Sequence, residues 1–225
     1  FYDLLVDLTT KIKGLKRLRI SSIEMSQVSD EIIEIIGKSP IIVDHLHIPI
    51  QSGTDSILRR MARHYNTAEF EKKYFELKEA LPGISITTDV IVGFPGETEE
   101  DFADTYNWIK KLHFNQLHVF PYSRRKGTPA DRMPSQVPGD VKKERVRRLL
   151  QLSDELKTEF ALSEMNKELE VLIEEEKDGY MVGHASNYLK VLVADTSLKE
   201  GHIYKVKVTD HRGYDLIGVV SSEEA

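Results

Sequence analysis

Between residues 15 and 122, short runs rich in isoleucine, valine and leucine alternate with helical patterns. This alternation is typical of βα units, in which helices cover a parallel sheet of strands buried on both faces. Strands are expected at residues 18–23, 41–50, 84–92 and 117–122. The fold class is therefore α/β, and four such units can form a partial or open barrel or part of a doubly wound sheet.

A second unit follows the alternating region. Residues 127–139 are an irregular, basic, proline-rich segment, and a long helix is expected from about Asp140. From about Met165 the pattern changes to short strands at 169–173, 188–193, 203–208 and 216–220, with Asp178-Gly179 as a turn. Short strands at even spacing predict a small OB-like barrel. We therefore expect two domains, 1–162 and 163–225.

The chain contains no cysteine, which excludes disulfides, thiolate zinc sites, cysteine nucleophiles and iron–sulfur clusters held by these residues. No run of about 18 apolar residues and no signal peptide are visible, so we expect a cytoplasmic protein without a membrane segment. The first residue is Phe1, and we interpret the sequence as a piece of a longer protein. A partial or open barrel exposes a strand edge, which predicts an artefactual dimer of the piece.

Positive charge is concentrated in one segment of a chain whose net charge is -6. Residues 123–148 contain nine basic and three acidic residues, whereas residues 165–225 contain seven basic and twelve acidic ones. This distribution is typical of a phosphate-binding patch on an acidic protein, and equally of a solvated loop and helix face.

Polar residues follow each predicted strand, where ligands bind in parallel sheets. They include Ser22 with Glu24, Gln51 with Ser52, and Gly93 in a turn before a helix capped by Thr98. Glycines allow close approach of a ligand and helix N-termini offer amide donors, although a tight βα turn explains the same residues.

A metal site is a competing hypothesis. His45 and His47 lie on one face of a predicted strand, and Asp89 and His118 on later strands could join them, as in a metal-dependent barrel hydrolase. A His-x-His pair in a strand is more often used for packing or hydrogen bonding, and we assign no metal ligand. Gly-x-Ser-x-Gly is absent, and no catalytic triad is proposed.

Three runs together carry a family resemblance: residues 45–63, which begin His45-Leu46-His47-Ile48-Pro49, residues 88–98, and residues 121–130. In order and spacing they resemble the radical S-adenosylmethionine methylthiotransferases. Residues 178–191 resemble the family's TRAM domain, a small RNA-binding β-barrel. The resemblance implies a partial parallel (β/α) radical S-adenosylmethionine barrel followed by an all-β TRAM barrel.

The resemblance also implies S-adenosylmethionine as cofactor, and two [4Fe-4S] clusters whose cysteine ligands lie outside this chain. It predicts no general acid or base. The residues expected to contact the cofactor are Ser22, Glu24, Gln51, Ser52, Asp89, Ile91, Gly93, Phe120 and Tyr122.

The implied reaction adds a methylthio group to a hypermodified adenosine of tRNA. The sequence most resembles the threonylcarbamoyladenosine branch, with the isopentenyladenosine branch as competitor. The residues expected to contact tRNA are Arg124, Arg125, Arg148, Tyr180, Asn187, Tyr188 and Lys190. Two other functions stay open: a free-standing RNA-binding module on a barrel scaffold, and the metal-dependent hydrolase.

Overall fold

A four-stranded parallel sheet in the order β1-β2-β3-β4 organises the first part of the chain. The structure is a computed structural model that describes residues 1–223. The elements of this part are α1 (Tyr2–Lys11), β1 (Leu18–Ile20), η1 (Met25–Gln27), α2 (Asp30–Lys38), β2 (Ile42–His47), α3 (Asp55–Arg60), α4 (Thr67–Ala80), β3 (Ser85–Val92), α5 (Glu99–Leu112), β4 (Gln116–Pro121), α6 (Pro129–Arg132) and α7 (Gly139–Ser163).

Local capping explains where the main helices begin. The side chains of Ser29, Asn66 and Thr98 each accept a hydrogen bond from a backbone N–H in the first turn of α2, α4 and α5. Thr98 caps α5 as the sequence predicts, and with Asp101 it forms a capping box, which satisfies two backbone donors at the start of the helix.

The two faces of the sheet differ in chemistry. Leu46, Ile86 and Val90 are fully buried in the hydrophobic core that α2, α4 and α5 share with the sheet. Because side chains alternate along a strand, His45 and Thr87 lie on the other, inner face. The inner face is therefore polar, while the outer face carries the core.

The second part is a closed five-stranded barrel in the order β5-β6-β7-β9-β8. Its strands are β5 (Glu168–Lys177), β6 (Tyr180–Ala185), β7 (Lys190–Val193), β8 (Ile203–Arg212) and β9 (Asp215–Glu223). It has its own core, which includes Val171, Val191 and Val206. The predicted fold class, a partial parallel sheet followed by a small all-β barrel, is confirmed. The boundary at 162/163 stays a prediction, and residues 224 and 225 of the second domain lie outside the described residues.

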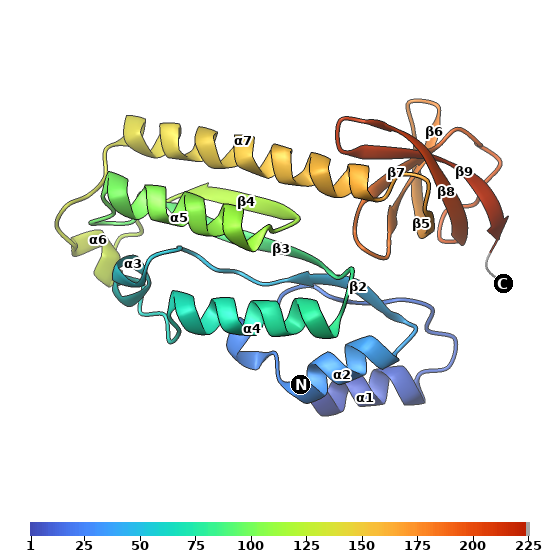
Figure 1. Ribbon diagram of the computed structural model, residues 1–225, viewed down its shortest axis with the longest axis horizontal. Helices are drawn as coiled ribbons and strands as arrows, with labels where there is room; N and C mark the ends of the chain where they lie inside the picture. The colour runs from blue at the N-terminus through green and yellow to red at the C-terminus, as the bar shows by residue number, and fades with distance from the viewer. Residues whose placement is uncertain (224–225) are drawn as a thin grey trace.

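Helix α7 connects the two parts. Leu149 and Leu152 pack in the core of the sheet, and Ala161 packs in the core of the small barrel. Figure 1 shows α7 running from the region of α6 to the small barrel. The small barrel therefore lies at the opposite end of α7 from the loop that follows β4.

Several predicted boundaries differ from the structure. Strand β2 ends at His47, before Pro49, which has no N–H for a sheet hydrogen bond. The predicted strand 188–193 begins instead at Lys190, because Tyr188 has a left-handed φ of 68° inside the turn before it. Helix α1 was not predicted. No helix within residues 1–223 is long and apolar enough to cross a membrane.

Candidate functional site

Residues that follow three strands meet at the carboxyl edge of the sheet. Ile91 on β3 is the register partner of Phe120 on β4, and Gln51 forms an isolated bridge with Val90. The Gln51 N–H donates to the Asp89 carbonyl over 2.9 Å, and the Ile91 N–H donates to the Gln51 carbonyl over 2.8 Å. Half of the Phe120 side chain is exposed there. The structure thus brings these predicted cofactor residues together, and their contact with a cofactor stays a prediction.

The segment 51–53 is held tightly against α5. Gln51 has a φ of 63°, which is uncommon for a residue other than glycine. A Cβ atom on Gly53 would lie 2.8 Å from the Thr105 Cα, so only glycine fits. The Ser52 side chain is buried, and its hydroxyl has no hydrogen-bond partner among the described residues. A buried unpaired hydroxyl costs about 1–3 kcal/mol, so this segment carries strain and an unmet hydrogen bond.

Three other predicted residues flank the same edge. Ser22 is exposed after β1, and Glu24 caps η1 while its carboxylate lies 3.2 Å from the Arg63 guanidinium. The Tyr122 ring packs edge-on against Phe94, and its buried hydroxyl has no partner among the described residues. Glu24 is thus engaged in local structure, whereas the Tyr122 hydroxyl is a second unmet hydrogen-bonding group.

Gly93 accommodates a side chain from helix α7. Its φ is 73°, and a Cβ atom there would lie 2.1 Å from the Lys142 Cγ. The Lys142 ammonium donates to the Tyr122 carbonyl over 3.0 Å. The glycine is therefore explained by the packing of the Lys142 stem, and close approach of a ligand to Gly93 stays a prediction.

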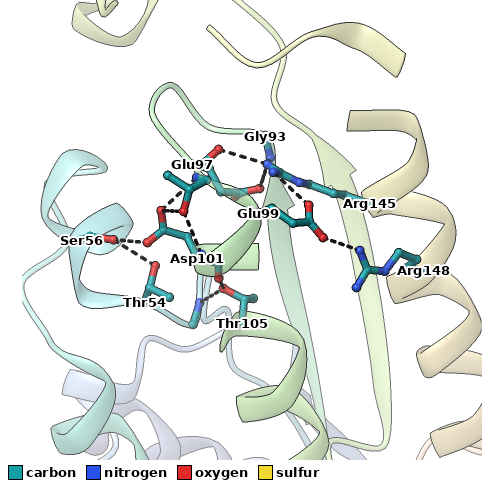
Figure 2. A network of polar contacts seen from close by, with 11 residues as sticks. Thr54, Ser56, Gly93, Glu97, Glu99, Asp101, Thr105, Arg145 and Arg148 are labelled. Carbon is teal, nitrogen blue, oxygen red and sulfur yellow. Dashed lines mark hydrogen bonds and ion pairs between the residues drawn. The ribbon is translucent and has the colours of Figure 1, made fainter. Parts of the chain in front are cut away.

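A buried ion pair fixes the turn between β3 and α5. Arg145 Nη1 lies 2.6 Å from Glu97 Oε1, and their side chains are 5% and 4% exposed. The Gly93 N–H donates to the same Glu97 oxygen over 2.9 Å, as Figure 2 shows. The Glu97 carboxylate therefore bonds both to the first residue of the turn and to Arg145 of α7. Burial raises the pKa of Glu97, while the hydrogen bonds from Gly93 and Arg145 oppose that rise.

The basic segment is partly neutralised. Arg145 belongs to the basic segment for which we expected either a phosphate-binding patch or a solvated face, and both expectations are wrong for this residue, because its side chain is buried against Glu97. Arg148 lies 2.7 Å from Glu99, and Arg124 lies 3.0 Å from Asp131. The side chains of Arg124 and Arg148 stay at least one third exposed, so their contact with RNA stays a prediction.

The predicted RNA-binding residues of the small barrel are also engaged within the protein. The Tyr188 ring stacks on His45 with 4.6 Å between centroids, which places it against the sheet. Asn187 is buried, and the Lys190 ammonium lies 2.8 Å from the Asp215 carboxylate. Tyr180 is half-buried on β6. These placements give Asn187 and Tyr188 a structural role, and RNA contact by any of the four stays a prediction.

The histidines form no metal site. The His45 Nε2 and the His47 Nδ1 both lie within hydrogen-bond distance of the Thr87 hydroxyl, and the His47 Nε2 lies 3.3 Å from Asp89. Within residues 1–223, no three His, Cys, Asp or Glu side chains are arranged to hold a metal ion. The hydrolase hypothesis therefore has no structural support.

Comparisons with known proteins agree with this geometry. Residues 2–109 match the Radical SAM superfamily. Threonylcarbamoyladenosine tRNA methylthiotransferase MtaB of Bacillus subtilis (strain 168) is 52% identical over 92% of this chain and 47% of that protein. A tRNA-2-methylthio-N(6)-dimethylallyladenosine synthase of Aquifex aeolicus (strain VF5) is 41% identical over 97% of this chain and 49% of that protein. Coproporphyrinogen III oxidase (HemN) from Escherichia coli, a radical SAM enzyme, has a TM-score of 0.50 and 16% identity over 87% of this chain and 46% of that chain, a likeness of fold alone.

The four-stranded parallel sheet and the match of residues 2–109 together assign this chain to the radical S-adenosylmethionine superfamily. Within that superfamily the chain belongs to the methylthiotransferase family, as the resemblance in the sequence predicts. The chain spans about half the length of the curated relatives it matches.

The buried ion pair gives a direct test of how the turn is held. Replacing Arg145 by methionine leaves the Glu97 carboxylate buried and unpaired, which should lower the free energy of unfolding by about 3 kcal/mol. The matched change Arg147→Met removes an exposed pair with Glu144 and should change the free energy of unfolding far less, because solvent screens that pair. Urea unfolding measures both. Adding Glu97→Gln to Arg145→Met should recover part of the loss, and equal losses in the two single variants would contradict the role of the buried pair.

Proposed function

We propose that these residues are part of a radical S-adenosylmethionine tRNA methylthiotransferase that acts on threonylcarbamoyladenosine. The observation that carries the proposal is the carboxyl edge, where Gln51, in the segment after β2, lies beside β3 with Ile91 and β4 with Phe120. The threonylcarbamoyladenosine branch is supported by the 52% identity to the Bacillus subtilis protein, against 41% to the Aquifex aeolicus dimethylallyladenosine synthase.

The residues at the edge fit an adenosine-containing cofactor. Within residues 1–223 the hydroxyls of Ser52 and Tyr122 have no hydrogen-bond partner, and polar atoms of a ligand could satisfy them. Ile91 and the half-exposed Phe120 offer an apolar surface for a purine ring. When bound, S-adenosylmethionine and an iron–sulfur cluster supply the activation of the adenosine C–H bond and the methyl group.

The chain's own residues would bind and orient the cofactor. Gln51 offers an amide to ribose hydroxyls, with Ser22 and Glu24 approaching from the β1 side of the edge. Asp89 lies on the inner face, two residues before Ile91 on the same strand, and its carboxylate can accept hydrogen bonds there. The turn 93–98 places the N-terminus of α5 beside the site, held by Glu97 and Arg145. The ligands of two [4Fe-4S] clusters are assigned to other parts of the protein, since this chain has no cysteine.

We further propose that tRNA contacts both ends of α7. Arg124 and Arg125 follow β4 and are exposed beside the carboxyl edge, where they can bind phosphates near the target adenosine. The small barrel carries Tyr180 and Lys190 at the far end and would contact a more distant part of the RNA. A tRNA substrate also places the protein in the cytoplasm.

Analysis of tRNA nucleosides tests the function. In a strain lacking the gene, 2-methylthio-threonylcarbamoyladenosine should disappear while the unmodified threonylcarbamoyladenosine accumulates, as measured by liquid chromatography and mass spectrometry. The full-length gene should restore it, and the Gln51→Ala variant should restore less. Loss of a methylthiolated dimethylallyladenosine instead would favour the other branch. Methylthiolation by residues 1–225 alone would contradict the assignment of the cluster ligands to other parts of the protein.

Charge reversal tests the RNA contact of the basic segment. Arg124→Glu with Arg125→Glu should weaken tRNA binding and lower the slope of log Kd against log salt by about 2, since each lost phosphate contact removes about 0.9. Lys72→Glu with Lys110→Glu makes the same charge change on exposed positions of α4 and α5 and should leave the slope unchanged. Equal slopes in the two double variants would show that residues 124 and 125 do not contact phosphate.

A further inference from the structure

A line of hydrogen-bonding side chains crosses the inner face of the sheet. His45 Nε2 lies 3.1 Å from the Thr87 hydroxyl, and the same hydroxyl lies 2.9 Å from His47 Nδ1. His47 Nε2 lies 3.3 Å from Asp89 Oδ1. The line therefore runs along strands β2 and β3 toward the carboxyl edge, and it ends two residues before Ile91.

Each hydrogen bond along this line has its donor on the Arg19 side and its acceptor on the Asp89 side. Arg19 Nε is 3.5 Å from His45 Nδ1, and an arginine only donates, so His45 Nδ1 must accept. A neutral His45 then carries its proton on Nε2 and donates it to Thr87. The single hydroxyl proton of Thr87 is thereby directed to His47 Nδ1, which leaves the His47 Nε2–H to donate to Asp89.

His45 is held in the neutral form that this order requires. Burial, with the neighbouring Arg19, His47 and His118, lowers the pKa of His45 to about 3. Thr87, which faces it from β3, is uncharged, and the other ring packed on it belongs to Tyr188. His45 is therefore neutral at neutral pH, and its Nε2–H donates to Thr87.

The small barrel packs on the first members of the line. The Tyr188 ring stacks on His45, and the Arg19 guanidinium lies 3.8 Å from the Tyr188 ring centroid. Tyr188 adopts a left-handed backbone, a conformation that costs about 1–2 kcal/mol for such a residue. The turn is stabilised by the Tyr188 N–H, which donates to the Ala185 carbonyl over 2.9 Å, and by the Ser186 hydroxyl, which donates to Asp44 on β2 over 3.1 Å. These hydrogen bonds hold the turn in the conformation that places the Tyr188 ring against the sheet.

We propose that Tyr188, His45, Thr87 and His47 are positioning residues that hold the Asp89 carboxylate in one orientation and make that orientation depend on docking of the small barrel. The inference rests on the proposed function in one respect, that the edge beside Asp89 holds the cofactor. In this role the four residues act through Asp89. All four ring nitrogens of the two histidines are used by the line, which agrees with the lack of a metal site within the described residues.

Nitrogen NMR of the imidazoles tests the line without any activity. In the 225-residue protein, His45 should be neutral with the proton on Nε2 and should not titrate above pH 4, and His47 Nδ1 should accept a hydrogen bond from the Thr87 hydroxyl. Thr87→Val keeps the shape of the side chain but removes its hydroxyl, and should abolish the tautomer preference of His47. Thr158→Val, which removes an exposed hydroxyl on α7, should change neither ring. A proton on Nδ1 of either ring, or a His45 that titrates near pH 6.5, would overturn the proposal.

Kinetics of the reconstituted full-length enzyme test the positioning role. Thr87→Val should lower kcat by about tenfold and leave the KM for tRNA within about twofold, because a misplaced group affects the reacting geometry rather than RNA affinity. Tyr188→Ala should also lower kcat, and Tyr188→Phe, which keeps the ring, should restore it. Unchanged kcat in Thr87→Val and Tyr188→Ala would overturn the role. If the wild-type enzyme does not methylthiolate tRNA, the proposed function fails, while the NMR result still decides whether the line exists.

Discussion

The buried ion pair between Glu97 and Arg145 is the contact on which the arrangement of the site depends. Glu97 accepts hydrogen bonds from the Gly93 backbone and from Arg145 of α7, so one carboxylate fixes both the turn after β3 and the first turns of α7. Helix α7 also packs in the core of the small barrel. The same ion pair therefore helps to orient the helix that connects the sheet to that barrel. Two charges buried in this way are retained only with close geometry and added hydrogen bonds, and both are present here.

In the proposed function, helix α7 separates cofactor binding at one end from RNA binding by the small barrel at the other. Its 25 residues span about 37 Å, with Lys142 and Arg145 beside the carboxyl edge at one end and the small barrel at the other. The edge has the apolar and hydroxyl groups that suit a nucleoside cofactor, and the exposed arginines that follow β4 suit the phosphates of a nearby RNA segment. The small barrel is acidic overall, so charge at its surface is a weaker anchor for RNA than the basic segment.

The sequence predicted the elements better than the contacts among them. Strand and helix positions follow from hydrophobic periodicity and from caps such as Thr98 with Asp101, because these signals are local. The burial of Arg145 could not be predicted, since its charge looks the same in a solvated cluster as in a buried pair. The stack of Tyr188 on His45 joins residues far apart in the chain and depends on a left-handed backbone that no local pattern indicated. The positions at the edge were predicted from strand ends together with the family resemblance, because parallel strands bring their carboxyl ends together.

Hydrogen–deuterium exchange of the full-length protein, with and without S-adenosylmethionine, tests the central claim most directly. The claim is that the carboxyl edge built by residues 51–53 and 91–98 holds the cofactor. Addition of S-adenosylmethionine should slow amide exchange in these two segments, while segments of the small barrel exchange as before. Unchanged exchange at residues 51–53 and 91–98, with protection elsewhere, would contradict the account.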